Sequence, residues 1–297
     1  MRVLLFGGTG QVGAEICALA GDAGVDLVAP GHADLDLTDR EAIAELIVSQ
    51  PWDIVINAAA YTNVDGAESE EALAFAINAE APARISIESD RRGIPLIHIS
   101  TDYVFDGKKG APYVEQDSIG PLNAYGRSKA EGERVAGAAN RRHIILRTSW
   151  VYSHRRKNFV KTILQLARTR SQLKIVADQH GCPTGARDIA RACLEIAKRC
   201  VSEREHAPYG VYHYAGAGEA SWFEFAIAII DLAGKRLSRP PEVLPIPTRD
   251  YPTPAIRPLD TRLDCGLVAK NFNIALQPWQ HALADAIDRL LTDEDFQ

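Results

Sequence analysis

The chain has 297 residues, a formal net charge of −6 at pH 7 and an isoelectric point near 5.8. Its length accommodates one large α/β domain, alone or with a smaller partner, and a full hydrophobic core. The acidic balance excludes a basic surface for nucleic acid, and no apolar run approaches the roughly 18 residues that a membrane span needs. We therefore expect a soluble protein that acts on a small molecule.

Two features point to the cytoplasm. The apolar start of the chain, Met1 to Gly7, stops at a glycine turn and lacks the length and cleavage pattern of a signal peptide. The cysteines are odd in number and have no paired metal-type spacing, which predicts reduced, mostly buried thiols. They are Cys17, Cys182, Cys193, Cys200 and Cys265.

The first predicted elements are a strand, a glycine-rich turn and a helix. Arg2 to Phe6 is predicted as the strand and Ala14 to Leu19 as the helix. The glycines between them, Gly7, Gly10 and Gly13, let the backbone turn sharply, approach a pyrophosphate and pack the helix on the strand. Because a helix amino terminus also favours negative charge, this context predicts a dinucleotide site more strongly than a turn without a ligand.

The second strand, Val25 to Ala29, leaves the type of dinucleotide open. NAD enzymes carry an acidic residue after this strand and NADP enzymes a basic one, whereas this chain has Gly31-His32. Asp36 and Leu37 follow and could lie at the adenine. Thr38 and Glu41 have the spacing of a capping box, which predicts a helix from Asp39 to about Ser49.

The next two strands are expected to bring further residues to the same edge of a parallel sheet. Asp53 to Asn57 is followed by Ala58-Ala59-Ala60, whose small side chains would let a flat cofactor lie against the carboxyl edge, where doubly wound sheets bind ligands. After a long helical stretch, Glu68 to Asp90, the fourth strand is Pro95 to Ser100. His98 lies within its apolar run and is interpreted as a core histidine.

The pair Tyr125 and Lys129 is the main catalytic candidate. A surface loop, Val104 to Leu122, leads to a predicted helix in which the two residues are four positions apart and so share one face. A tyrosine has an unperturbed pKa of about 10, and a nearby ammonium group would lower it. Alone, the pair could be a solvated surface contact; the glycine turn and Thr101, at the end of the fourth strand, favour a catalytic role.

The rest of the chain alternates less regularly. Arg155-Arg156-Lys157 could meet a substrate phosphate, although such a cluster is usually only solvated. The loop Asp178 to Thr184 is interpreted as a pocket wall, and a Pro-rich run covers Pro240 to Pro258. Further strands are expected at 143–147, 174–177 and 211–214, and further helices at 186–199, 221–234 and 280–291.

The fold predicted from this order is α/β, with a doubly wound parallel sheet of the Rossmann type and a smaller α/β carboxyl-terminal region for substrate. Residues 1–150 would form the NAD(P)-binding domain, with 170–200 returning to it, and residues 201–297 mainly the smaller region.

Five segments resemble, in order, the signatures of the extended short-chain dehydrogenase/reductase superfamily and, within it, the dTDP-4-dehydrorhamnose reductase family. They are GGTGQVG at 7–13, NAAAYT at 57–62, STDYVFDG at 100–107, YGRSK at 125–129 and DQHG at 178–181. The resemblance covers nearly the whole chain. Sister dehydratases follow the Thr-Asp pair with a Glu that removes a sugar C5 proton, but here Tyr103 follows Thr101-Asp102. The resemblance therefore implies a simple carbonyl reduction.

The resemblance also implies a mechanism and a set of site residues. Hydride from NADPH or NADH would reduce the C4 ketone of dTDP-4-dehydro-L-rhamnose, with Tyr125 as general acid, Lys129 lowering its pKa and holding the nicotinamide ribose, and Thr101 polarising the carbonyl. The implied cofactor residues are Gly7, Gly10, Gln11, Val12, Gly13, Asp36, Leu37, Ala58, Ala59, Ala60, Tyr125 and Lys129. The implied substrate residues are Thr101, Asp102, Tyr103, Trp150 and Arg257.

Some alternatives stay open. A reductase that makes another nucleotide deoxysugar, such as the talose epimer, would carry the same residues, and a relative of the family is a non-catalytic NADP-binding regulatory subunit. Some members of the family dimerise around Mg²⁺, and Glu15 with the tail Asp293-Glu294-Asp295 could imitate such a site, although the tail could equally be an ordinary solvated terminus. The resemblance thus implies a dTDP-sugar as substrate and a possible homodimer.

Overall fold

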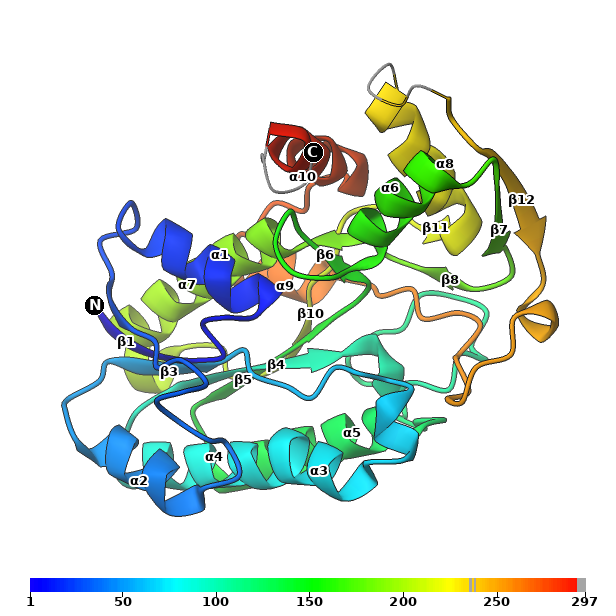
Figure 1. The fold of residues 1–297 in the computed structure, drawn as a ribbon. Coiled ribbons are helices and arrows are strands. Elements are labelled where there is room, and N and C mark those ends of the chain that lie inside the picture. Colours follow the sequence, from blue (N-terminus) through cyan, green and yellow to red (C-terminus); the bar gives the residue numbers. More distant parts are fainter. Residues whose placement is uncertain (235–236, 238, 293–297) are drawn as a thin grey trace.

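A parallel six-stranded sheet with the order β10-β5-β4-β3-β1-β2 is the centre of the computed structural model, which describes residues 1–292 except 235, 236 and 238 (Figure 1). The strands are β1 Arg2–Phe6, β2 Asp26–Val28, β3 Ile54–Asn57, β4 Leu96–Thr101, β5 His143–Thr148 and β10 Gly210–His213. All neighbouring strands pair in parallel, so their carboxyl ends reach one edge. The predicted doubly wound parallel sheet is confirmed.

Helices cover both faces of this sheet (Figure 1). On one face lie α1 Gln11–Ala20, α7 Ala186–Glu203 and α9 Gly266–Phe272, and on the other α2 Arg40–Val48, α3 Glu71–Phe75, α4 Ala81–Arg91 and α5 Ala124–Ala139. Successive side chains of β1 alternate between the two faces: Val3 and Leu5 enter the core beneath α1 and α7, while Leu4 and Phe6 enter the core beneath α2 and α4. This two-sided burial explains the continuous apolar run.

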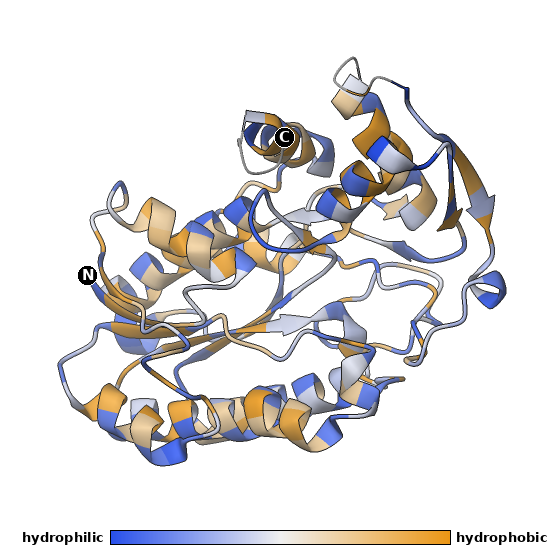
Figure 2. Ribbon diagram, viewed as in Figure 1, coloured by the Kyte–Doolittle hydropathy of each residue, from blue (hydrophilic) through white to orange (hydrophobic). Residues whose placement is uncertain are grey.

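A second hydrophobic core lies beyond the carboxyl edge. It is built from α6 Phe159–Thr169, α8 Trp222–Ala233 and α10 Trp279–Thr292, together with a parallel pair of strands, β7 Gln172–Val176 and β12 Glu242–Ile246. Short strands connect the two regions: β6 Val151–Tyr152, β8 His180–Gly181, β9 Thr184–Gly185 and β11 Ala220–Ser221. Apolar residues line the main strands and the inward helix faces (Figure 2). None of the helices among the described residues is long and apolar enough to cross a membrane.

The structure corrects two local predictions. The capping box at Thr38 and Glu41 is wrong: Asp39 is the N-cap of α2, and its carboxylate accepts hydrogen bonds from the backbone N–H groups of Glu41 and Ala42. The Pro-rich run contains strand β12, which the sequence analysis missed. Pro245 is tolerated there because β12 pairs only with β7 and needs no donor on its outer side.

Other expectations are met. The cysteines are all free, and only Cys17 is exposed. His98 is fully buried, as expected for a core histidine. The expected strand at 211–214 exists as β10 and joins the main sheet beside β5, although the sequence analysis had placed this stretch mainly in the smaller region. The division of the chain into two domains stays a prediction.

The predicted long helix at 68–90 contains one π-helical turn, Ala76–Glu80, between α3 and α4. Pro82 explains the irregularity, because it lacks the N–H group that would bond the Asn78 carbonyl in a regular helix. The turn directs the Asn78 side chain to Tyr61 and to Ser128 on α5, with hydrogen bonds of 2.9 to 3.1 Å. It therefore ties the loop after β3 to the helix that carries Tyr125.

We predict that Gly132→Ala destabilises the protein by about 1–3 kcal/mol, measured by denaturant unfolding. A Cβ at Gly132 would lie 2.0 Å from the Asn78 carbonyl oxygen, so α5 would have to move. Gly21→Ala is the matched control: a Cβ there meets nothing within 4 Å, and the residue has helical φ and ψ angles. Equal stability of the two variants would contradict this close packing.

Candidate functional site

A cavity of about 540 Å³ lies at the carboxyl edge of the main sheet, between the glycine turn and α5. Its walls come from the turn after β1, the loop after β2, the ends of β3 and β4, and the start of α5. The predicted cofactor residues on these walls are Gly7, Gly10, Gln11, Val12, Asp36, Leu37, Ala58, Ala59, Ala60, Tyr125 and Lys129. Distant segments of sequence thus meet in one groove.

The glycine turn is shaped for close backbone packing. Gly7 has φ +83°, and its carbonyl accepts the N–H of Gly10 at 3.0 Å. A Cβ at Gly13 would lie 2.1 Å from that same carbonyl oxygen. Gly13 therefore packs α1 against the turn and does not line the cavity. The open side of the turn faces the cavity with the amino terminus of α1, a site that favours phosphate.

Two basic residues also line this cavity. Arg156 and Lys157 follow β6, and Arg156 Nε donates a hydrogen bond of 2.7 Å to the Thr9 carbonyl in the glycine turn. His32 also lines the cavity. The sequence analysis associated the basic cluster with a substrate phosphate; the structure places these two residues in the same cavity as the predicted cofactor residues. Only the local run of charge could have indicated them.

Tyr125, Lys129 and Thr101 come together where α5 packs on the end of β4. Asn123 caps α5, its Oδ1 accepting the N–H of Gly126 at 2.8 Å, and its Nδ2 donates to the Ile256 carbonyl at 2.8 Å. The Thr101 hydroxyl lies close enough to the Tyr125 hydroxyl to favour its charged form. The Tyr125 ring packs edge-on against Tyr103, with ring centroids 5.9 Å apart.

Lys129 is almost wholly buried, with 2% of its surface exposed, and Nζ donates to the Ile99 carbonyl at 2.7 Å. Burial lowers the pKa of Lys129 to about 8, although the nearby Glu133 carboxylate opposes this effect. The expectation that Lys129 lowers the pKa of Tyr125 is not met in this structure. Burial raises the pKa of Tyr125 to about 12, against the effect of the Thr101 hydroxyl, and the Asp102 charge adds to the increase.

Of the two remaining candidates, Trp150 packs against the second hydrophobic core and Arg257 lines a cavity beside it. Trp150 stacks face to face on Trp222, with centroids 3.5 Å apart. Trp222 and Arg257 line a separate cavity of about 660 Å³ beside α6 and β7. The Arg257 guanidinium donates two hydrogen bonds of 2.9 Å to the Asp65 carboxylate. The guanidinium that was predicted to bind phosphate therefore already binds a carboxylate in this structure.

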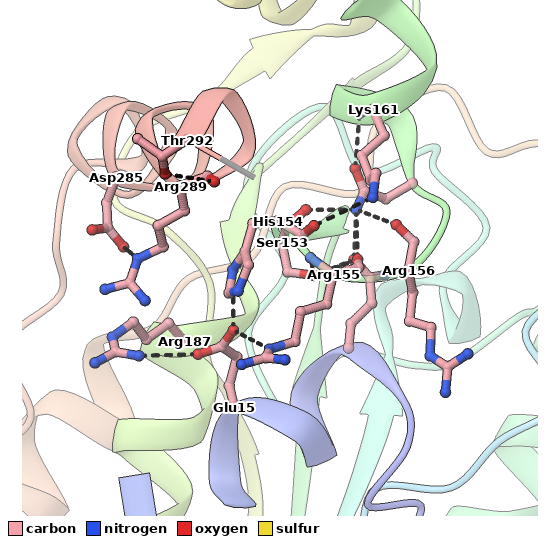
Figure 3. Close-up of polar contacts among 12 residues, drawn as sticks. Glu15, Ser153, His154, Arg155, Arg156, Lys161, Arg187, Asp285, Arg289 and Thr292 are labelled. Carbon is pink, nitrogen blue, oxygen red and sulfur yellow. Dashed lines mark hydrogen bonds and ion pairs between the residues drawn. The ribbon is translucent and has the colours of Figure 1, made fainter. Parts of the chain in front are cut away.

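Glu15 has surroundings that do not fit a divalent cation. Its carboxylate is 1% exposed and contacts Arg187 Nη1 at 3.1 Å, Arg155 Nε at 3.3 Å and His154 Nδ1 at 3.3 Å (Figure 3). Two guanidinium groups therefore neutralise the charge that Mg²⁺ would need. The part of the chain that the structure describes contains no group of three or more His, Cys, Asp or Glu that could hold a metal ion. The acidic tail 293–295 lies outside the described residues.

Comparisons of sequence and of structure with known proteins point to the same family. Residues 1–292 match the family model described as RmlD substrate binding domain. A dTDP-4-dehydrorhamnose reductase from Sinorhizobium fredii is 42% identical over 293 residues, which cover 99% of each chain. The solved dTDP-4-dehydrorhamnose reductase from Clostridium acetobutylicum has a TM-score of 0.91 at 35% identity, covering 98% of this chain and 100% of that one. The Bacillus anthracis enzyme, solved with NADP, has a TM-score of 0.89 at 32% identity, covering 97% and 99%.

We predict that Mg²⁺ and EDTA leave the thermal unfolding midpoint unchanged, because cationic side chains already occupy the space around Glu15. Glu15→Gln should lower the unfolding free energy by about 1–3 kcal/mol, since Arg155 and Arg187 lose a buried carboxylate but stay partly exposed. Calorimetry with and without each additive checks both statements. Stabilisation by Mg²⁺ that disappears in Glu15→Gln would mean that the carboxylate does bind the metal.

Proposed function

The chain belongs to the dTDP-4-dehydrorhamnose reductase (RmlD) family of extended short-chain dehydrogenase/reductases, and we propose that it reduces the C4 ketone of dTDP-4-dehydro-L-rhamnose to dTDP-L-rhamnose with NADPH or NADH. The observation that carries the proposal is that Thr101, Tyr125 and Lys129 come together beside the cavity that the predicted cofactor residues line. The protein is thus an NAD(P)H-dependent oxidoreductase of dTDP-L-rhamnose biosynthesis.

The cavity fits a nicotinamide dinucleotide. The glycine turn and the α1 amino terminus suit a pyrophosphate, Asp36 and Leu37 lie toward the adenine end, and Ala58 to Ala60 leave room for a flat ring beside β3. Arg156 and Lys157 add positive charge near the turn. When bound, the nicotinamide supplies the hydride; the remaining chemistry falls to the side chains.

Tyr125 is the group we assign to the proton. As hydride adds to C4, the electron pair of the C=O bond moves to the oxygen, which takes the proton of the Tyr125 hydroxyl to become the alcohol. Lys129 lines the same cavity one helical turn along α5, and we propose that its ammonium group stabilises the phenolate that remains and binds the nicotinamide ribose. Thr101 supplies the neighbouring hydroxyl.

The substrate is proposed to lie beyond Tyr125, between β4 and the second core. Tyr103 and Trp150 offer aromatic faces for the deoxysugar or the thymine. Arg257 is proposed to contact the diphosphate at the rim of the 660 Å³ cavity, sharing its fork with Asp65. Tyr103 occupies the position where dehydratases have a catalytic Glu, so no base is available there for removal of a C5 proton.

We predict that Tyr125→Phe lowers kcat by about 10²- to 10⁴-fold, the range expected for loss of a positioned acid, while NADPH affinity changes little. Steady-state oxidation of NADPH and a fluorescence titration of the cofactor measure the two quantities. Tyr209→Phe, at the opposite end of the sheet just before β10, is the matched control and should retain full activity. Near-normal turnover by Tyr125→Phe would refute the assignment.

A second prediction concerns pH. Because burial lowers the pKa of Lys129 to about 8, the ammonium charge is present below that pH and is lost as the pH rises through it. We expect the reduction rate to fall above about pH 8, and expect Lys129→Met to be slow and without this decline. Rates measured from pH 7 to 9.5 decide the point; a Lys129→Met profile that keeps the decline would assign it to another group.

A further inference from the structure

Asp102 was expected to contact substrate, but its carboxylate is turned into the protein. It begins the short 3-10 helix Asp102–Val104 after β4 and is 2% exposed. Oδ1 accepts the Thr101 hydroxyl at 3.1 Å and Oδ2 accepts the Ser149 hydroxyl at 2.8 Å. The Thr261 hydroxyl also faces the carboxylate and favours its charged form. Three segments that are distant in sequence thus direct hydroxyl groups at one carboxylate.

No cation balances this carboxylate: among the described residues, no Arg, Lys or His forms an ion pair with Asp102. Burial raises the pKa of Asp102 to about 6, even though three hydroxyls and its own backbone N–H favour the charged form. The titratable groups that face it are Tyr103, Tyr125 and Cys182. Burial raises the pKa of each, so all three stay neutral between pH 5 and 7.5.

The Thr101 hydroxyl can donate a hydrogen bond to only one neighbour at a time. Thr101 Oγ1 accepts the N–H of Tyr103 at 3.2 Å, and the Thr101 hydroxyl also lies close enough to the Tyr125 hydroxyl to favour its charged form. A hydroxyl has a single proton. While that proton points to the Asp102 carboxylate, Thr101 can only accept from Tyr125.

We propose that Asp102 is a positioning residue whose protonation decides whether Thr101 accepts a hydrogen bond from Tyr125 or donates one to it. A protonated Asp102 donates a hydrogen bond to the Thr101 oxygen, and the Thr101 hydroxyl then donates its hydrogen bond to the Tyr125 oxygen. A deprotonated Asp102 accepts the hydrogen bond of the Thr101 hydroxyl, which can then only accept from Tyr125. The inference rests on the proposed reduction, in which Tyr125 must release its proton.

The two states differ in how well they tolerate the phenolate left on Tyr125. With Asp102 ionised, two negative charges would lie close together in a buried site, and Thr101 would donate to only one of them. With Asp102 protonated, the phenolate gains a donor and loses the neighbouring charge. Protonation of Asp102 therefore makes Tyr125 the stronger acid, and no proton is created or lost when the Thr101 hydroxyl turns.

The kinetic test compares the wild-type protein with Asp102→Asn between pH 5 and 7.5 at saturating substrates. The wild-type kcat should fall about threefold as the pH rises through about 6. This size follows if ionisation of Asp102 raises the pKa of Tyr125 by about one unit and the rate depends on that pKa with a Brønsted slope of about one half. Asp102→Asn should show no such change. NADH and NADPH are used in parallel, because the 2′-phosphate of NADPH titrates in the same range. A variant slower by one factor at every pH, with the wild-type decline intact, would reduce Asp102 to a structural role and overturn the proposal.

An infrared titration tests the same coupling without substrate. The C=O band of the protonated Asp102 carboxyl is identified by its absence from Asp102→Asn. In the wild type this band should be lost as the pH rises through about 6. Ser149→Ala removes one donor to the carboxylate and should move this midpoint upward, and the kinetic decline must move with it. Thr101→Val should move the infrared midpoint in the same direction. If the wild type does not reduce the sugar, the proposed function fails while the infrared series still decides this inference; a midpoint unmoved by Thr101→Val overturns it.

Discussion

The close approach of α5 to the end of β4 determines where the reacting side chains lie. A Cβ at Gly126 would be 2.4 Å from the Tyr103 carbonyl oxygen, and one at Gly132 would be 2.0 Å from that of Asn78, so only glycine lets the helix come this near. The same approach allows Lys129 to reach the Ile99 carbonyl at 2.7 Å. Asn123, the N-cap, then fixes the start of α5 at the next residue, Ala124. Packing of backbone against backbone thus sets the geometry of the proton transfer.

Burial of charge is the second constraint, and the protein uses it in two ways. Around Glu15 the charge is neutralised by arginines, and this arrangement contributes to stability. Among the described residues, Lys129 and Asp102 form no ion pair, and burial moves the pKa of each toward neutrality, to about 8 and about 6, although the Glu133 carboxylate partly opposes the effect on Lys129. Such groups cost stability but can change protonation in the working range of an enzyme. Asp102 acts on Tyr125 through its charge, and Lys129 lines the same cavity as Tyr125.

Local sequence pattern predicted the parts of the fold that depend on neighbouring residues. The strand, glycine turn and helix at the start of the chain, and the four-residue spacing of Tyr125 and Lys129, are readable because they act within one segment. The partners of Asp102 are not: Ser149 and Thr261 lie 47 and 159 positions away and meet it only through tertiary packing. Strand β12 was missed for a related reason, since its pairing with β7 overrides the presence of Pro245.

The central claim is that Tyr125 and its neighbours support reduction of a sugar C4 ketone. The most direct measurement follows NADPH carrying deuterium at the transferable position, with dTDP-4-dehydro-L-rhamnose as substrate, and identifies the product by NMR. The account predicts dTDP-L-rhamnose with deuterium at C4 and equimolar loss of NADPH. Deuterium retained in the cofactor, or a product with the opposite C4 configuration, would contradict it.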